Sequence, residues 1–166
     1  MEATKQLQPV EMALGKISSG LFIVSARSKS GEKQEGYLAS WIQQISFSPM
    51  MVALAMKPGR PCYDLIKSGA PFCINIVGTN NGGLMKPFWS PKEGVDPFAA
   101  MGPEEMRISE KGNIVLLKAM AYLECEFSHS ITPGDHELVF AEVKEGGILQ
   151  AEDKPLNHVR KSGMGY

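Results

Sequence analysis

The chain has 166 residues and a mass of 18.1 kDa, which fits a single domain over residues 1–166 that is long enough to bury its own core. Hydrophobic residues make up 43% of the sequence and charged residues 21%, which excludes a disordered tail and a fibrous protein. The net charge of −1 argues against nucleic-acid binding, and the longest apolar runs, such as residues 50–56, are too short to cross a membrane.

The first residues and the cysteines predict a cytoplasmic protein. Residues 1–10 are polar and contain no apolar stretch followed by a small-residue cleavage site. Cys62, Cys73 and Cys125 are widely spaced and form no C-x-x-C pair, which supports neither zinc nor a redox dithiol. Scattered single thiols of this kind fit a reducing compartment.

The first half of the chain predicts one helix followed by strands. Apolar residues between 10 and 17 recur at helical spacing, with Pro9 in the first turn and Gly20 as the stop. Residues 21–26 form a β-rich run, and the polar residues 28–33 indicate a hairpin loop. The later elements of this half are strands at 35–41, 51–56 and 72–77 and a short helix at 61–68 closed by Gly69.

The second half is irregular before it returns to strands. Residues 78–112 are rich in Pro and Gly, and such a stretch inside a compact domain usually carries function or covers an edge. Long alternating strands are expected at 119–127 and 136–144, after which Gly146-Gly147 turns the chain into a short strand at Ile148. Because strands follow strands with few helices between them, the sequence predicts a mainly β fold, an antiparallel sheet closed into a barrel.

Several common catalytic patterns are absent. The sequence contains no G-x-G-x-x-G after a strand, no P-loop and no G-x-S-x-G elbow. A metal site would have to use His129, Asp135 and His136, whose spacing matches no common ligand pattern. A serine hydrolase built on Asp135 and His136 is equally weak, because adjacent residues of a strand point to opposite faces. We therefore predict no metal.

One segment favours a flat ligand. The strand that ends at Ala39 and Ser40 presents small side chains just before Trp41. Small side chains let a planar ring approach the main chain, whose N–H groups would donate hydrogen bonds together with the Ser40 hydroxyl. The alternative is an ordinary strand and turn with Trp41 packed in the core.

Three further segments carry candidate charged groups. Lys57 and Arg60 precede the start of the predicted short helix, a combination that suits a phosphate monoester or, alternatively, a solvated basic turn. His136 opens a strand at a tight turn, where it would touch a ligand or act as a structural histidine. Lys86 lies in the irregular stretch, where it would stabilise negative charge on a reduced ring or simply be solvated.

In this order, the segments resemble the flavin reductase-like family of FMN-binding split barrels, in particular the flavin reductase module of flavodiiron proteins. The matching stretches are Leu38 to Trp41 with Gln44, Ser46 and Pro49, the strand 51–56, the helix 60–66, the strand 72–77, and Gly134-Asp135-His136. The resemblance covers about residues 10–166. It implies a split, Greek-key-like antiparallel β-barrel and FMN bound in a groove at a homodimer interface.

The resemblance also implies the site residues. Those expected to bind FMN are Glu35, Leu38, Ala39, Ser40, Trp41, Gln44, Ser46, Lys57, Arg60, Cys62, Lys86, His136 and Tyr166. Glu35 and residues 39–41 would line the isoalloxazine edge, and Lys57, Arg60 and Cys62 would lie near the phosphate and ribityl chain. Lys86 and His136 would be catalytic, near the ring and the nicotinamide, and Tyr166 would place an aromatic ring over the flavin.

The function that follows from the resemblance is an NAD(P)H:flavin oxidoreductase. Bound FMN would accept hydride from NADH or NADPH and pass electrons to free flavin, ferric iron, oxygen or a partner protein. Lys86 and main-chain N–H groups would stabilise the charge that develops on the ring, and His136 would orient the nicotinamide amide or relay a proton. The alternatives are an FMN-binding electron-transfer protein without its own NAD(P)H site and a cofactor-free β-barrel interaction module.

Overall fold

The computed structural model describes residues 6–89 and 95–165. The strands of its main sheet are β2 (Phe22–Arg27), β3 (Gln34–Ala39), β4 (Ile42–Phe47), β5 (Met50–Met56), β6 (Phe72–Ile76), β9 (Ala121–Ile131) and β10 (Glu137–Ile148). Two short pairs consist of β1 (Ser19–Gly20) with β11 (Asn157–His158), and β7 (Met106–Ile108) with β8 (Ile114–Leu116). The helices are α1 (Pro9–Leu14), α2 (Pro61–Lys67), the 3₁₀ helix η1 (Thr79–Met85) and α3 (Lys86–Trp89).

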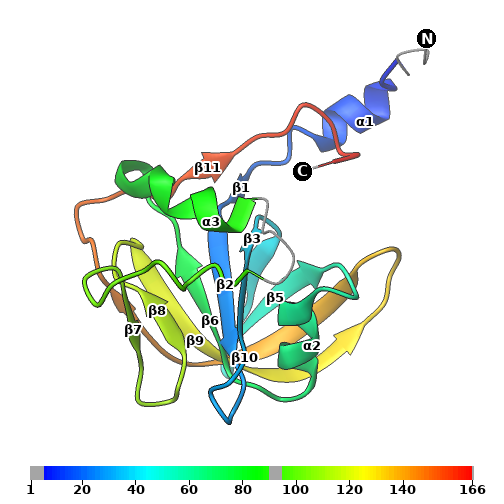
Figure 1. The fold of residues 1–166 in the computed structure, drawn as a ribbon. Coiled ribbons are helices and arrows are strands. Elements are labelled where there is room, and N and C mark those ends of the chain that lie inside the picture. Colours follow the sequence, from blue (N-terminus) through cyan, green and yellow to red (C-terminus); the bar gives the residue numbers. More distant parts are fainter. Residues whose placement is uncertain (1–5, 90–94, 166) are drawn as a thin grey trace.

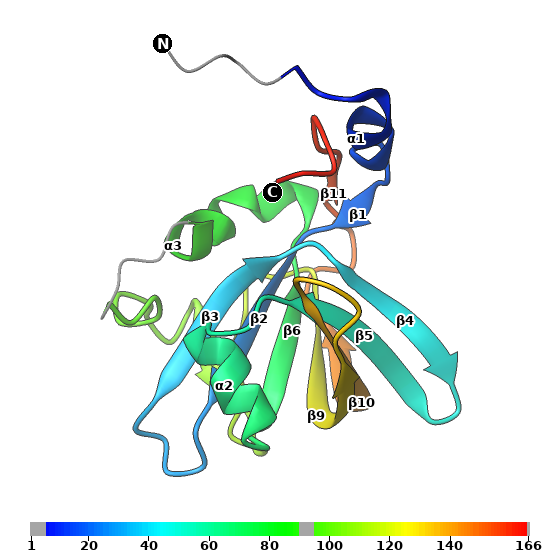
Figure 2. The same ribbon diagram turned by 90° about the vertical axis from the view of Figure 1, so that its right-hand side faces the viewer.

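The main sheet is antiparallel throughout and strongly bent. Its seven strands follow the order β3-β2-β6-β9-β10-β5-β4. The hairpin of β4 and β5 swings away from β2 and β3, while α2 covers β2 and β3 (Figures 1 and 2). β3 and β4 stand at the two ends of the strand order, so the barrel stays split. The mainly β, split-barrel fold predicted from the sequence is confirmed.

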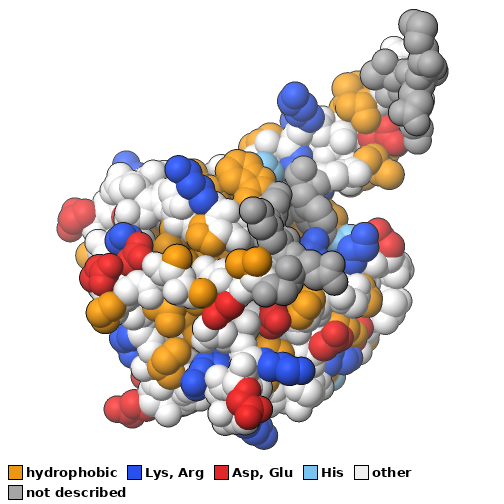
Figure 3. Space-filling model, in the orientation of Figure 1, with side chains coloured by type: hydrophobic (Ala, Val, Ile, Leu, Met, Phe, Trp, Pro, Cys, Tyr) orange, Lys and Arg blue, Asp and Glu red, His pale blue; other side chains and the backbone are white. Residues whose placement is uncertain are grey.

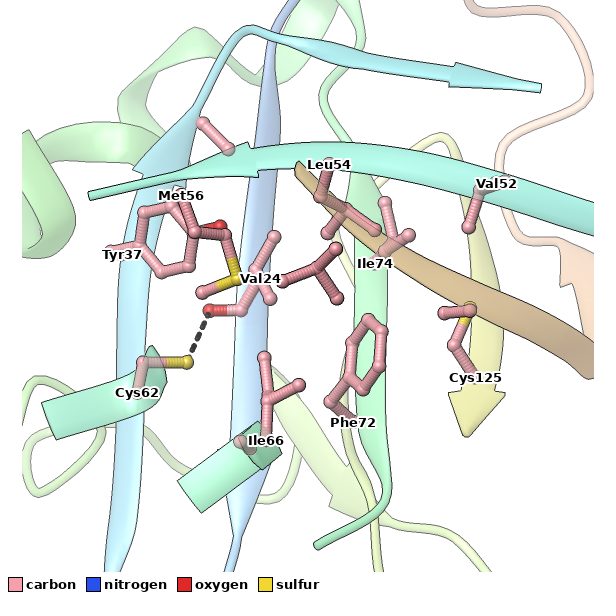
Figure 4. Packing of buried hydrophobic residues seen from close by; sticks show 14 residues of the cluster. Val24, Tyr37, Val52, Leu54, Met56, Cys62, Ile66, Phe72, Ile74 and Cys125 are labelled. Carbon is pink, nitrogen blue, oxygen red and sulfur yellow. Dashed lines mark hydrogen bonds between the residues drawn. The ribbon is translucent and has the colours of Figure 1, made fainter. Parts of the chain in front are cut away.

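The inside of the bent sheet is filled by apolar side chains that α2 closes off. Val24 comes from β2, Leu54 from β5, and Phe72 and Ile74 from β6, whereas Ile66 comes from α2; all five are fully buried (Figure 4). Burying one such side chain stabilises the fold by about 1.5–3 kcal/mol. Packing of this cluster therefore fixes the position of α2, and with it the segment that precedes the helix.

A second apolar cluster covers the other face of the sheet. Phe88 of α3 and Phe98 pack together, with ring centroids 5.2 Å apart, over Ile23. They press directly on β3, because a Cβ atom added to Gly36 would lie 2.7 Å from both phenylalanine rings. Glycine at this position allows α3 to approach the strand closely.

The three cysteines belong to these interiors. Cys62, Cys73 and Cys125 are buried and free, and the Cys62 thiol lies 4.0 Å from the carbonyl oxygen of Val24 (Figure 4). Burial raises the pKa of all three thiols, that of Cys125 to about 12. The thiols are therefore protonated at neutral pH.

Three stretches depart from the sequence-based expectation. β4 was not expected, because an edge strand with solvent-facing Gln43 and Gln44 lacks apolar alternation. The stretch predicted to be irregular contains η1, α3 and β7. The first helix ends at Leu14 rather than near residue 17 and buries none of its residues, so it projects from the body of the molecule (Figure 1).

The predicted turn at Gly146-Gly147 is wrong. β10 continues through both glycines to Ile148 and stays paired with β9 as far as Ala121. A Cβ atom at Gly146 would lie 2.7 Å from the carbonyl oxygen of Tyr122, and one at Gly147 would lie 2.9 Å from the Tyr122 ring. These glycines allow two strands to approach closely and do not reverse the chain.

Glu137, the first residue of β10, ties α2 to the sheet. Its carboxylate accepts hydrogen bonds from Lys67, 2.5 Å away, and from the hydroxyls of Ser130 and Tyr63. The hydrogen bond from Lys67, followed by those from Ser130 and Tyr63, lowers the pKa of Glu137 to about 2. Because Tyr63 and Lys67 belong to α2, one carboxylate fastens both ends of the helix.

This arrangement predicts a specific pH dependence of stability. Glu137→Gln should lower the free energy of unfolding at neutral pH, because the carboxylate is charged there and holds its three donors. The difference from wild type should shrink as pH falls from the ordinary value of 4.5 toward about 2, where the native carboxylate becomes protonated. Urea unfolding at several pH values measures this.

The matched control is Glu142→Gln, which removes a carboxylate of the same strand from an exposed ion pair with Lys144. Exposed ion pairs contribute little, so this variant should differ little from wild type at any pH. If Glu137→Gln lowers the free energy of unfolding by the same amount down to acidic pH, the result contradicts a lowered pKa of Glu137 in the folded protein.

Candidate functional site

Two adjoining cavities lie where β3, the end of β5 and α2 meet. The larger, about 1250 Å³, is bounded by β3, α2, α3 and residues 95–97, and the smaller, about 40 Å³, by residues 37–41, 55–57 and Arg60. Because both share residues 37–40 and Arg60, we treat them as one site and call it the cleft. On the face seen in Figure 3, hydrophobic side chains interrupt a surface with charges of both signs.

The end of β3 borders the cleft with small side chains. Ala39 closes the strand and Ser40 follows; both are buried, and both line the two cavities. The N–H of Ala55 donates to the carbonyl oxygen of Trp41 at 3.0 Å, which holds the connection to β4 against β5. Only one methyl and one hydroxymethyl group therefore lie between the cleft and the main chain at this point.

Two cations stand at the smaller cavity. Gly59 has a φ of 82°, in the left-handed region that favours glycine, and the turn that it permits makes Arg60 the residue before α2. The Arg60 guanidinium carbon lies 5.8 Å from the centre of the Tyr37 ring. Lys57 is exposed at the end of β5. A guanidinium and an ammonium together suit an anionic group such as a phosphate.

His136 lies against Trp41. Their ring centroids are 5.2 Å apart, and the two planes are tilted by 54°. The Nδ1 atom of His136 is 2.9 Å from Oδ1 of Asp135, and this hydrogen bond lowers the pKa of the Asp135 carboxyl. The imidazole is thus held on one side by a carboxylate and on the other by an indole ring.

Carboxylates line the larger cavity. Burial raises the pKa of Glu35, and the nearby charge of Asp96 raises it further. Asp96 is fixed by two donors, the Gln34 side chain at 2.6 Å and the main-chain N–H of Phe98 at 2.8 Å. The cleft is therefore acidic on the side of the larger cavity and cationic on the side of the smaller one.

The structure brings together many of the residues that sequence reasoning selected. Eight of them border one or both cavities of the cleft: Glu35, Leu38, Ala39, Ser40, Trp41, Lys57, Arg60 and Cys62. His136 joins them through its contact with Trp41. Their roles toward a ligand stay predictions.

Other selected residues lie elsewhere. Gln44 and Ser46 are on β4, where the Gln44 amide donates to the Ser46 carbonyl oxygen at 3.3 Å. Lys86 is the exposed first residue of α3 and does not border either cavity. Cys62, the second residue of α2, borders the larger cavity, but its thiol faces Val24 in the core (Figure 4). Tyr166 lies outside the described residues.

Sequence reasoning missed several cleft residues. Tyr37, Asp96, Trp89 and His158 line the larger cavity, and the Arg160 guanidinium stacks on Trp41 at 4.9 Å. The alternation of Tyr37 with Ala39 along β3 was a signal that pointed to a shared face. No pattern in the sequence places Asp96, His158 or Arg160, because long loops bring them to the cleft.

No group of three or more His, Cys, Asp or Glu side chains suited to a metal ion occurs within residues 6–89 and 95–165. His129, one of the residues weighed for a metal, instead stacks on the Phe140 ring at 4.5 Å. In the same described ranges, none of the helices has the length and apolar character needed to cross a membrane.

Known proteins resemble the chain in sequence and in fold. The diflavin flavoprotein A 1 of Synechocystis sp. strain PCC 6803 is 35% identical over 159 residues, which cover 95% of this chain. The chain spans only about a quarter of that relative, 27% of its length.

Two solved structures share the fold. The NADH:FAD oxidoreductase SgcE6 of Streptomyces globisporus C-1027, in complex with NAD and FAD fragments, has a TM-score of 0.78 at 19% identity, covering 89% of this chain and 85% of that one. The styrene monooxygenase flavin reductase of Pseudomonas putida S12 has a TM-score of 0.74 at 26% identity and covers 89% and 90% of the two chains.

The sequence model described as the flavin reductase like domain matches residues 14–164, a range that contains every described element from β1 to β11 and the whole cleft. The chain therefore belongs to the flavin reductase like domain family.

Proposed function

We propose that this protein is an NAD(P)H-dependent flavin reductase that holds FMN in the cleft. The observation that carries the proposal is the meeting of the small-residue end of β3, at Ala39 and Ser40, with the cations Lys57 and Arg60 in one cavity wall. A planar ring with a phosphate tail needs both features at once, because its two ends have opposite chemistry.

The residues present fit FMN. The larger cavity, about 1250 Å³, has room for a drug-sized ligand, and its lining combines apolar side chains with polar and charged ones such as Ser40, Glu35 and Arg60. Ser40 and nearby main-chain N–H groups offer donors to the polar edge of the ring, while Arg60 and Lys57 offer charge to the phosphate. Glu35 would approach from the acidic side of the cleft.

When bound, FMN supplies a ring that takes up two electrons from a reduced nicotinamide and releases them to an acceptor. This chain's residues would bind the flavin and orient the nicotinamide. His136, fixed by Asp135, would position the nicotinamide amide or hold a proton close to it. Lys86 is exposed at the start of α3, and a role in stabilising charge requires its long side chain to reach the ring.

We favour FMN, and FAD is the alternative flavin, because the SgcE6 structure contains FAD fragments. NADH and NADPH are both candidate donors. Free flavin, ferric iron, oxygen and a partner protein are the candidate acceptors. The three buried thiols fit a cytoplasmic setting.

We also propose that the protein is a homodimer. α1 buries none of its side chains, although Val10 is 64% exposed and Ile17, just after the helix, is 63% exposed. At the tip of the β4–β5 hairpin, Phe47 is 88% exposed. Large apolar side chains exposed on projecting elements are typical of a surface that a second subunit covers.

The first functional test is flavin binding by Arg60→Gln. We expect FMN to bind about tenfold more weakly than to wild type, because one charge-assisted contact to phosphate is lost. Riboflavin, which lacks the phosphate, should bind both proteins alike. Flavin fluorescence titration measures both affinities, with FAD as a third ligand.

Arg107→Gln is the matched control, because the Arg107 guanidinium also lies over a tyrosine, 5.4 Å from the centre of the Tyr122 ring, but Arg107 borders neither cavity of the cleft. Equal weakening of FMN and riboflavin in Arg60→Gln would contradict a phosphate contact. A wild-type protein that binds neither flavin would favour a cofactor-free interaction module.

The second test addresses hydride transfer. Anaerobic stopped-flow mixing of the FMN-loaded protein with NADH or NADPH should bleach the flavin absorbance, and His136→Ala and Lys86→Ala should each slow that bleaching by about tenfold or more. If wild-type flavin stays oxidised with both donors, the protein is an FMN electron carrier. If both variants react at the wild-type rate, the two assigned roles are wrong.

The third test addresses assembly. Sedimentation velocity should show a wild-type dimer, and Phe47→Ser combined with Val10→Ser should shift it toward monomer, because two exposed apolar anchors are lost. Ile108→Ser, which changes an exposed apolar residue of β7, should leave the dimer intact. A wild-type monomer at every concentration tested would refute the proposal.

A further inference from the structure

We propose that Arg160, in the segment after β11, binds the phosphate groups of the nicotinamide electron donor. The inference rests on the proposed function, because it names a residue that would contribute to the affinity for the nicotinamide donor. Sequence reasoning did not select Arg160.

The first observation is a stack of three side chains. The Arg160 guanidinium carbon lies 4.9 Å from the centre of the Trp41 ring, and Trp41 is itself 5.2 Å from the His136 ring. A guanidinium within about 6 Å of an indole face is held by cation–π attraction. Stacking uses the face of the guanidinium, so its in-plane N–H groups stay available to an anion.

The second observation is how this position is fixed. The main-chain N–H of Arg160 donates to the Gly15 carbonyl oxygen at 3.1 Å, and the main-chain N–H of Gly163 donates to the Glu11 carbonyl oxygen at 2.6 Å. A Cβ atom at Gly15 would lie 2.7 Å from the Ser162 main chain. The segment after β11 thus lies against α1, which the views in Figures 1 and 2 agree on. Main-chain contacts therefore place Arg160, and these contacts do not use its guanidinium.

The third observation is charge. Among the described residues, no carboxylate forms an ion pair with Arg160, whose Nη1 donates to the neutral carbonyl oxygen of Gly165 at 3.4 Å. Lys67 offers the contrast, because Glu137 neutralises it. Arg160 therefore carries positive charge that no described carboxylate offsets, directly over a cleft residue.

The arrangement favours the donor over the flavin as the anion. Lys57 and Arg60 border the smaller cavity and suffice for one flavin phosphate. Arg160 is grouped instead with His136, through Trp41, and His158 of the same segment lines the larger cavity. The nicotinamide donor must leave after each turnover. A half-buried cation at the surface suits such a donor, because its phosphates can bind and leave without charges being buried deeply in the protein.

The experiment compares Arg160→Gln and Arg160→Lys with Lys161→Gln, which removes a charge from the exposed neighbouring residue. Calorimetric titration of the FMN-loaded proteins with NAD⁺ and NADP⁺ measures binding without turnover. We expect Arg160→Gln to weaken nucleotide binding and raise the donor KM by about tenfold, with kcat and FMN affinity near wild type. Arg160→Lys should recover part of the loss, and Lys161→Gln should match wild type.

The outcomes separate cleanly. Unchanged nucleotide affinity and KM in Arg160→Gln overturn the inference, and so does a loss confined to FMN affinity, which would assign Arg160 to the flavin phosphate. An equal loss in Lys161→Gln would reduce the effect to general electrostatic attraction and overturn it as well. A wild-type protein that binds FMN but accepts no electrons from either donor defeats the proposed function, whereas the results above leave that function standing.

Discussion

The pairing of β10 with β5 is the constraint on which the cleft depends. Its register sets Glu137 opposite Met56, so the residue before Glu137 and the residue after Met56 arrive at the same end of the sheet. These residues are His136 and Lys57. The neighbouring pairing of β4 with β5 then brings Trp41 to Ala55. A shift of this register by one residue would turn each of these side chains to the opposite face.

The same end of β10 also controls α2. Glu137 accepts hydrogen bonds from Tyr63 and Lys67 of the helix, and the buried cluster around Ile66 holds the helix from beneath. Arg60 immediately precedes that helix. The position of a cleft cation is therefore set by the interior of the molecule and by one carboxylate, although the cation itself is half-buried. The small overall charge of −1 gives no sign of this local separation of cations and carboxylates.

Much of the fold was predictable, since strands such as β5 and β6 are apolar on both faces and need no partner to be recognised. β4 was not, because its exposed glutamines carry no apolar alternation. The turn predicted at the two glycines of β10 was wrong because glycine occurs both in turns and where strands pack closely. Only the Tyr122 ring beside these glycines shows that they serve close packing. In the cleft, residues 39–41 and Arg60 stood out by type and order. Asp96 and Arg160 did not, because only the folded loops bring them near.

The burial of all three thiols has a consequence for a protein proposed to handle reduced flavin. Reduced flavins react with oxygen and release peroxide, and peroxide attacks the thiolate form of cysteine. Cys62 and Cys125 are sealed inside the barrel and Cys73 lies beneath its outer face, each with a proton that burial makes hard to remove. The interior of the fold therefore shields its sulfur atoms from the by-product that its own cleft would generate.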